Sequence, residues 1–397
     1  MSTFYPWFRT IASLVLATLG GIGMFIAVVA LKPIAAEFGV SRSDASLAYA
    51  ATTLGFGIGG IFMGWLSDRV GVMWPSMIGA ACLSLGLLIA GTTEHFWVYV
   101  LAHGILIGLL GNSAVMVPLV ADITRWFVRN RGVAVAIVIS GSYCAGALWP
   151  TVVQYGIDTS GWRDTYQWLA GICLFGMFPL TLTLWRRAAP DRVETAAEAA
   201  STSRPMGFTP LFAQCFLCAA GLGCCVAMAV PQAHIVAHAS DLGHAAARGA
   251  EMLALVFGFG VVSRLGFGWL SDRIGGLRTV IVGSVMQALV IAAFIPISGL
   301  TALYWASALF GLSQGGIVPA YAIIIRRHFP AADIGWRVGL VMLFTLVGMG
   351  FGGWIAGVLY DLTGSYRAAF LNAIGFNLLN LIIAFVLLAK VRFAKLA

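Results

Sequence analysis

Long apolar runs alternate with short polar segments along the whole chain. Each run is close to the ~20 residues that a helix needs to cross a ~30 Å hydrocarbon core. Open strands are excluded because lipid offers no hydrogen-bond partner to unpaired backbone groups. The pattern therefore predicts an all-α membrane protein with twelve spanning helices, near residues 11–32, 46–66, 75–93, 96–121, 132–155, 166–185, 209–236, 249–270, 279–298, 301–325, 338–359 and 367–390.

One polar segment, RRAAPDRVETAAEAASTSRP at 186–205, separates the sixth apolar run from the seventh. It is rich in alanine and serine and contains two prolines, which is typical of a linker. The pattern predicts three parts: an N-terminal six-helix bundle at 1–185, a cytoplasmic linker at 186–208 and a C-terminal six-helix bundle at 209–397.

Composition and charge support a membrane location. The chain is 60% hydrophobic and 10% charged, whereas a soluble protein carries roughly a quarter charged residues. The net charge of +8 is dispersed between apolar runs, so no nucleic-acid partner is expected. Arginines and lysines concentrate in the termini and the even-numbered loops, which predicts cytoplasmic termini. We expect a monomeric multi-pass protein of the cell inner (plasma) membrane.

An octet recurs in the chain: GWLSDRVG at 64–71 returns as GWLSDRIG at 268–275, each time after the second apolar run of its half. Other segments align at a similar shift, such as TSGWRDTY with LTGSYRAAF. The chain is therefore interpreted as a duplicated six-helix unit. Parallel repeats of this kind build transporters whose substrate site lies near the bilayer midplane between the two halves.

The octets resemble the loop motif of the major facilitator superfamily, Gly-x-x-x-Asp-Arg-x-Gly. The resemblance covers the whole chain and implies that superfamily's fold, with the motif clamping the two halves in the outward-open state. The first copy departs from the pattern, because Val72 and Met73 stand where basic residues are expected. The motif residues are Gly64, Asp68, Arg69, Gly71, Gly268, Asp272, Arg273 and Gly275.

Asp122, at the end of the fourth apolar run, is a candidate member of the same charge network. We expect its carboxylate to pair with Arg69 or Arg131, since all three lie at helix ends on one side of the membrane. The alternative is a solvated charge at a helix end.

Arg264 is the one basic residue deep inside a predicted span. It precedes Asp272 by eight residues, which places it ~12 Å inside the helix end, near the midplane of a ~30 Å core. A guanidinium stays charged and can hold a carboxylate through two parallel hydrogen bonds. The alternative is an arginine that extends to the backbone or to Asp272.

Three segments narrow the resemblance to the monocarboxylate and oxalate/formate porter branch of the superfamily: SRLGFGWLSDRIG, WFVRNRGVAVAIVISGSYCAGALWP and EFGVSRSDAS. That branch carries an arginine in the eighth span that contacts the substrate carboxylate, and Arg264 matches it. The oxalate exchanger also uses a lysine in the eleventh span, whereas VGLVMLFTLVGMGFGGWIAGVL has no charge. The resemblance therefore favours a monocarboxylate over a dicarboxylate.

Several other polar residues are candidates for the substrate cavity. His103 is a candidate proton relay because its unperturbed pKa lies near neutrality; a structural histidine is the alternative. The others are equally compatible with helix packing: Asn112, Tyr143, Gln314 and Tyr321.

Enzyme classes are not indicated, since no metal triad, nucleophile–base pair or phosphate loop is present in the pattern. We expect no cofactor, no metal and no catalytic residue. The prediction is a secondary active transporter that moves small organic anions by alternating access, with proton symport as the preferred energetics. The alternatives are an exporter of drugs or metabolites and an anion exchanger.

Overall fold

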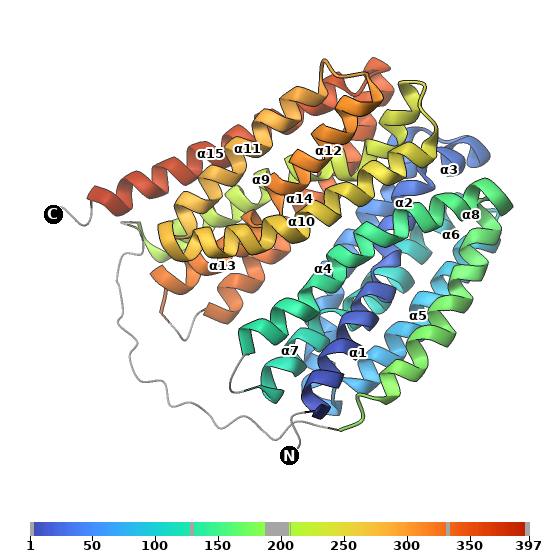
Figure 1. Ribbon diagram of the computed structural model, residues 1–397, viewed down its shortest axis with the longest axis horizontal. Helices are drawn as coiled ribbons and strands as arrows, with labels where there is room; N and C mark the ends of the chain where they lie inside the picture. The colour runs from blue at the N-terminus through green and yellow to red at the C-terminus, as the bar shows by residue number, and fades with distance from the viewer. Residues whose placement is uncertain (1–3, 128–130, 187–205, 207, 331–333, 394–397) are drawn as a thin grey trace. The chain divides into compact units, whose positions relative to one another are not determined.

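The computed structural model describes residues 4–127, 131–186, 206, 208–330 and 334–393, and within these ranges the chain is helical with no strand. Figure 1 shows the helices in chain order. Their bounds are α1 Phe4–Gly20, α2 Ile22–Val29, α3 Leu31–Phe38, α4 Arg42–Val70, α5 Met73–Thr92, α6 Phe96–Leu101, η1 Ala102–Asn112, η2 Ser113–Val115, α7 Val117–Trp126, α8 Arg131–Leu182, α9 Pro210–Asp241, α10 Ala246–Ile274, α11 Gly276–Phe294, α12 Leu300–Gln314, α13 Ile317–His328, α14 Ile334–Thr363 and α15 Arg367–Phe393.

Eleven segments of the described chain are long and apolar enough to cross a membrane. One of them, 133–182, is 50 residues long, or ~75 Å as a straight helix, far more than a bilayer core requires. The chain turns inside it at Gly161, whose φ of 84° and ψ of 164° are not helical. This segment holds the predicted fifth and sixth spans, so the twelve predicted spans correspond to helical segments of the structure.

The turn at Gly161 is fixed by its neighbours. Positive φ is readily adopted only by glycine. Arg163 follows it, and its Nε donates to Glu37 Oε1 at 2.6 Å while its Nη1 donates to the Thr93 carbonyl at 2.7 Å. The arginine thereby ties the turn in α8 to the ends of α3 and α5.

The chain divides into two compact units. Unit 1 comprises residues 1–192 and 236–257, and unit 2 comprises 193–235 and 258–397. In this division residues 236–257, the end of α9 and the start of α10, belong to unit 1 with the N-terminal helices. The greater part of the expected linker, 187–205 and 207, lies outside the described residues.

Ion pairs and a contact between two aromatic rings hold residues 236–257 in unit 1. Asp241 accepts a hydrogen bond from Lys32 Nζ at 2.9 Å and from Arg42 Nη2 at 2.7 Å. Deeper in the unit, the Phe257 ring meets the Phe25 ring edge-on, with centroids 4.8 Å apart.

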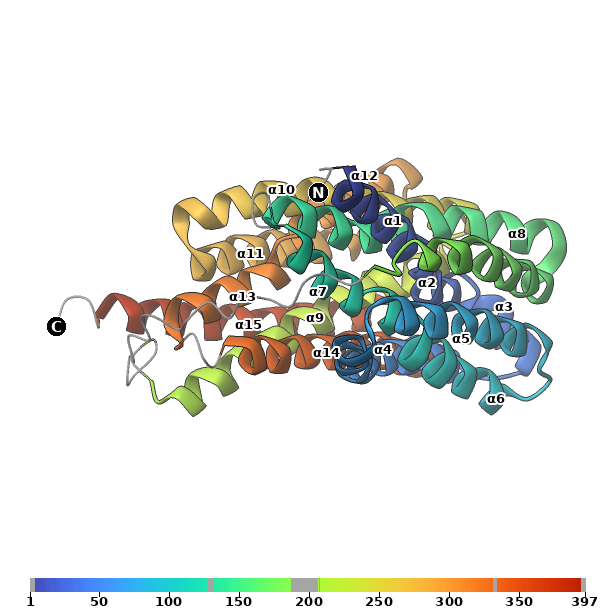
Figure 2. The ribbon, with the colours of Figure 1, turned by 90° about the horizontal axis from the view of Figure 1, so that it is seen from below.

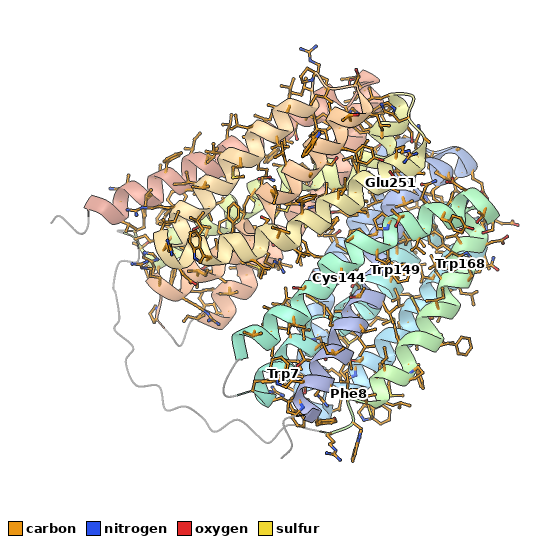
Figure 3. All side chains as sticks on the ribbon, in the orientation of Figure 1. Trp7, Phe8, Cys144, Trp149, Trp168 and Glu251 are labelled. Carbon is orange, nitrogen blue, oxygen red and sulfur yellow. The ribbon has the colours of Figure 1, made fainter. Side chains whose placement is uncertain are left out.

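Unit 1 is built on close helix contacts. Trp149 of α8, labelled in Figure 3, donates its indole N–H to the Thr18 carbonyl of α1 at 2.7 Å. Helix α4 approaches η1 so closely that a Cβ on Gly55 would lie 2.2 Å from the carbonyl oxygen of Gly104. Small residues permit such contacts, which drive helix association where the hydrophobic effect is absent.

Unit 2 repeats this construction. A Cβ on Gly348 of α14 would lie 2.5 Å from the Leu222 carbonyl oxygen of α9, and one on Gly352 would lie 2.5 Å from that of Val226. Helix α11 packs along α15; the two run beside each other in Figure 1, and Figure 2 shows the same helices from below. Polar groups reinforce the contact, since Asn377 Nδ2 donates to the Ser284 carbonyl at 2.8 Å.

The fourth span of each half is interrupted at an equivalent point. In unit 1 the α-helix changes to the π-helix η1 and the short 3₁₀ turn η2, and α7 starts at Val117-Pro118. In unit 2, α12 ends at Gln314 and α13 starts at Ile317, followed by Val318-Pro319. Interrupted helices in transporters expose backbone groups that serve binding sites.

Candidate functional site

Both octets fold in the same way. The second and sixth residues stand four apart on a helix and therefore face each other. The guanidinium carbon of Arg69 lies 4.1 Å from the Trp65 ring centroid, and that of Arg273 lies 4.1 Å from Trp269. The final glycine of each octet has positive φ, 86° at Gly71 and 82° at Gly275. The tryptophan–arginine stack and the glycine turn account for the second, sixth and eighth residues of the repeat, whereas the first residues, Gly64 and Gly268, make no close contact that would exclude a side chain.

The aspartate of the first octet joins two helix ends. Asp68 Oδ1 accepts a hydrogen bond from Arg125 Nη2 at 2.5 Å, linking α4 to α7. Both side chains are partly exposed, at 61% for Asp68 and 34% for Arg125. An ion pair at this exposure is worth little stability by itself, so it acts mainly in orienting the two ends.

Asp122 has a different partner from the expected ones. Its carboxylate accepts two hydrogen bonds from Arg9, from Nε at 2.6 Å and from Nη2 at 3.0 Å. Arg9 also donates to Tyr5 Oη at 3.0 Å and to the Leu184 carbonyl at 3.3 Å. The guanidinium carbon lies 4.9 Å from the Trp126 ring centroid. This pair ties α1, α7 and the end of α8 together.

The expectation that Asp122 pairs with Arg69 is thus corrected, because Arg69 stacks on a tryptophan and Arg9 occupies the carboxylate. The side chain of Arg131 lies outside the described residues. The sequence pattern does not predict Arg9 as the partner, although it is the one charged side chain among the first ten residues.

Arg264 lies at the interruption of the fourth span in unit 2. Its Nε donates to the Gly315 carbonyl at 3.4 Å. Ser263, its neighbour, donates to the Leu312 carbonyl at 2.6 Å and accepts from the Gly315 N–H at 3.1 Å. A Cβ on Gly315 would lie 2.3 Å from the Gly260 carbonyl oxygen. Helix α10 is therefore in direct backbone contact with the break, and Arg264 projects from that point of contact.

Gln314 brings a buried donor to the same place. It is the last residue of α12 and is 1% exposed. Its Oε1 accepts a hydrogen bond from Gln232 Nε2 at 2.5 Å, whereas its own Nε2 has no hydrogen-bond partner among the described residues. An orphaned buried donor costs ~1–3 kcal/mol. The break thus brings the Arg264 guanidinium to the N-terminus of α13, two features that attract an anion, and the last residue of α12 adds an unsatisfied amide N–H₂.

His103 lies in a closed hydrogen-bond chain in unit 1. Thr52 Oγ1 donates to the Ala48 carbonyl at 2.8 Å, so it accepts from His103 Nδ1 at 3.1 Å. The other ring nitrogen, Nε2, is left to accept from Tyr166 Oη at 3.1 Å, and that hydroxyl accepts from Tyr99 Oη at 2.8 Å. His103 is 0% exposed, and the neutral ring satisfies every partner, which favours a structural role.

The remaining candidates lie in separate surroundings. Tyr321 is 1% exposed and donates to Asn380 Oδ1 at 2.8 Å, which favours a packing role between α13 and α15. Tyr143 packs its ring on Phe257, with centroids 5.7 Å apart. Asn112 ends the π-helix η1 and is 5% exposed. Only Gln314 shares the helix break with Arg264.

The sequence profile of the Major Facilitator Superfamily matches residues 12–306 and 215–396. Similar curated proteins include monocarboxylate transporter 11 of Mus musculus, 27% identical over 79% of this chain and 72% of the relative. The MFS-type transporter YcxA of Bacillus subtilis is 25% identical over 85% of this chain and 84% of its own length. The MFS-type transporter pynF of Aspergillus niger is 26% identical over 76% of this chain and 69% of its length. The chain thus spans about two thirds of the fungal relatives that it matches.

Solved structures of the same fold are more distant in sequence. A peptide transporter POT in complex with sulfate has a TM-score of 0.76 at 13% identity, covering 96% of this chain and 94% of its own. A bacterial homolog to the human lysosomal transporter Spinster, inward-facing and occupied, has a TM-score of 0.74 at 15% identity, covering 99% and 98%. At these identities the likeness establishes the fold alone.

Proposed function

The chain belongs to the Major Facilitator Superfamily, and on this premise we propose that it is a secondary active transporter of small organic anions, chiefly monocarboxylates. Two six-helix bundles alternate access to one central site. Arg264 binds the substrate carboxylate, and the protein works as a monomer in the inner membrane with both termini in the cytoplasm.

The observation that carries this proposal is that Arg264 and Gln314 both lie at the break in the fourth span of unit 2. Arg264 contacts the Gly315 carbonyl, and one residue away Gln314 keeps an unpartnered, buried Nε2. A carboxylate supplies acceptors for both groups and removes the cost of the orphaned donor. A lipophilic cation, the substrate type of many exporters, would meet repulsion there.

The relatives lend support at the level of substrate class. Monocarboxylate transporter 11 of mouse and of man each match more than three quarters of this chain, at 27% and 28% identity. A monocarboxylate needs one cationic partner, which agrees with Arg264 as the one basic residue in the interior of the eighth span, 249–270.

Proton symport is the proposed energetics. The buried position of His103 argues against that ring as the carrier, because a second ring proton would place a charge on a side chain that is 0% exposed, which is costly. We therefore assign the coupled proton to the substrate carboxylate. An inward pH gradient should accelerate uptake, whereas an anion exchanger would instead require a counter-anion inside the vesicle.

Uptake of radiolabelled monocarboxylates into proteoliposomes tests the function. Arg264→Gln should abolish saturable uptake, since no other group replaces the guanidinium. Arg278→Gln is the matched control, because it removes the same charge from an exposed position of α11 and should leave uptake within about twofold. Uptake that survives Arg264→Gln, or efflux of lipophilic cations by the parent protein, would replace the anion proposal with the exporter.

A further inference from the structure

A cavity lies in unit 2 between α13 and α14, with a volume of about 290 Å³. This is at the small end of the range for small-molecule sites. Each helix contributes residues spaced one turn apart, so the cavity is a groove running between the two helices. Its lining residues are Ala322, Ile323, Arg326, Ile334, Gly335 and Val338.

Glycine leaves room in this groove. A Cβ on Gly335 would meet no atom within 4 Å, so α14 stands clear of its neighbours at that point. Four of the other lining residues are aliphatic. The groove is therefore suited to a small apolar body rather than to a polar solute.

Arg326 supplies the one charge of the groove. Within the described residues Arg326 has no hydrogen bond, ion pair or ring contact. Arg337 of α14 differs, because its guanidinium carbon lies 4.4 Å from the ring centroids of both Phe329 and Trp336. A free guanidinium beside an apolar wall is complementary to an anion with an apolar tail, and a carboxylate fits it through two parallel hydrogen bonds.

The groove is separate from the site at Arg264. Arg326 lies nine residues beyond Ile317, the first residue of α13, which is ~14 Å along the helix. A ligand that occupies 290 Å³ at Arg326 therefore does not reach the Gly315–Gly316 break. The two guanidinium groups lie toward opposite ends of one helix within unit 2.

We propose that this groove is a second anion site, which binds amphipathic monocarboxylates with the carboxylate on Arg326 and the hydrocarbon tail between α13 and α14. The proposal extends the proposed function and rests on it in one respect, since the same acids are expected to bind at Arg264. Tail length distinguishes the sites: affinity at the groove rises about fourfold for each methylene that it buries, until the groove is filled.

The test is equilibrium binding of radiolabelled butyrate, hexanoate and octanoate to purified protein in the Arg264→Gln background, which isolates the groove. We expect saturable binding that tightens with chain length, weakens in high salt and is lost on adding Arg326→Gln. Arg327→Gln is the matched control, because it removes the same charge from the adjacent position, which does not line the groove, and should leave binding within twofold.

Equal losses of binding affinity in the Arg326→Gln and Arg327→Gln variants would overturn the proposed site. An affinity that does not change from butyrate to octanoate would also overturn it. Val338→Trp, which fills the groove and keeps Arg326, should also abolish binding, and retained binding would contradict the location. Failure of the proposed function has a different signature, namely saturable uptake that survives Arg264→Gln alone.

Discussion

Replacing Arg9 by methionine should destabilise the protein more than the loss of any other single arginine that the structure describes at a helix end. The Arg9 side chain is 0% exposed and that of Asp122 is 8% exposed. Methionine keeps the volume and leaves the carboxylate buried without its two guanidinium hydrogen bonds. Breaking a buried pair in this way costs ~3–5 kcal/mol. At about 2–4 °C per kcal/mol for a domain of roughly 200 residues, the melting temperature should fall by ~6–20 °C.

The assay is thermal unfolding of purified protein in detergent, followed by intrinsic tryptophan fluorescence, for the single variants and the double variant Arg9→Met/Asp122→Leu. The double variant should recover most of the loss, because the orphaned charge is gone. Arg69→Met is the control: its stack on Trp65 is exposed and is worth ~0.5–1 kcal/mol. Equal effects of Arg9→Met and Arg69→Met, or a double variant as unstable as Arg9→Met, would refute the buried pair.

Three further predictions follow from local geometry. Gly161→Ala has room for its methyl group, but the φ of 84° at this position should lower the free energy of unfolding by ~1–2 kcal/mol through the backbone alone. Gly171→Ala is the control, because that position is equally unobstructed but helical, and it should be neutral or stabilising. Equal melting temperatures of the two variants would contradict the strain at the turn. Gly146→Ala places a Cβ 2.2 Å from the Phe257 ring and should cost ~1–3 kcal/mol by overpacking, with the loss relieved by Phe257→Leu in a double variant. His103→Phe should lower the melting temperature but keep the pH dependence of uptake, and a flat pH profile would restore this histidine as the proton carrier.

The spans were predictable because a bilayer demands long apolar runs, and the runs are visible in the sequence. The repeated octet was equally informative: its tryptophan–arginine spacing and terminal glycine recur as the same stack and the same positive φ in both halves. The ~12 Å of helix between Arg264 and Asp272 could also be counted from the sequence, since both residues lie on α10. These features depend on local sequence, which is why the pattern contains them.

Long-range partners were not predictable in the same way. Asp122 and Arg9 are 113 residues apart, and nothing in the local pattern distinguishes Arg9 from the arginines nearer in sequence. The break at Gly315–Gly316 had a readable signal in the glycine pair, yet its contact with α10 depends on packing. The saturation of both His103 nitrogens depends on Thr52 and Tyr166 from two other helices.

The most direct test of the central claim is the binding of a short monocarboxylate compared with its uncharged amide, measured by thermal shift on the parent protein and on Arg264→Gln. Butyrate and butyramide form a suitable pair, since they share a tail too short to fill the groove at Arg326. We expect butyrate to raise the melting temperature of the parent more than that of Arg264→Gln, the remaining shift to be lost on adding Arg326→Gln, and butyramide to raise neither. An equal shift by butyrate in the parent and in Arg264→Gln, or an equal shift by butyramide, would contradict carboxylate recognition by Arg264.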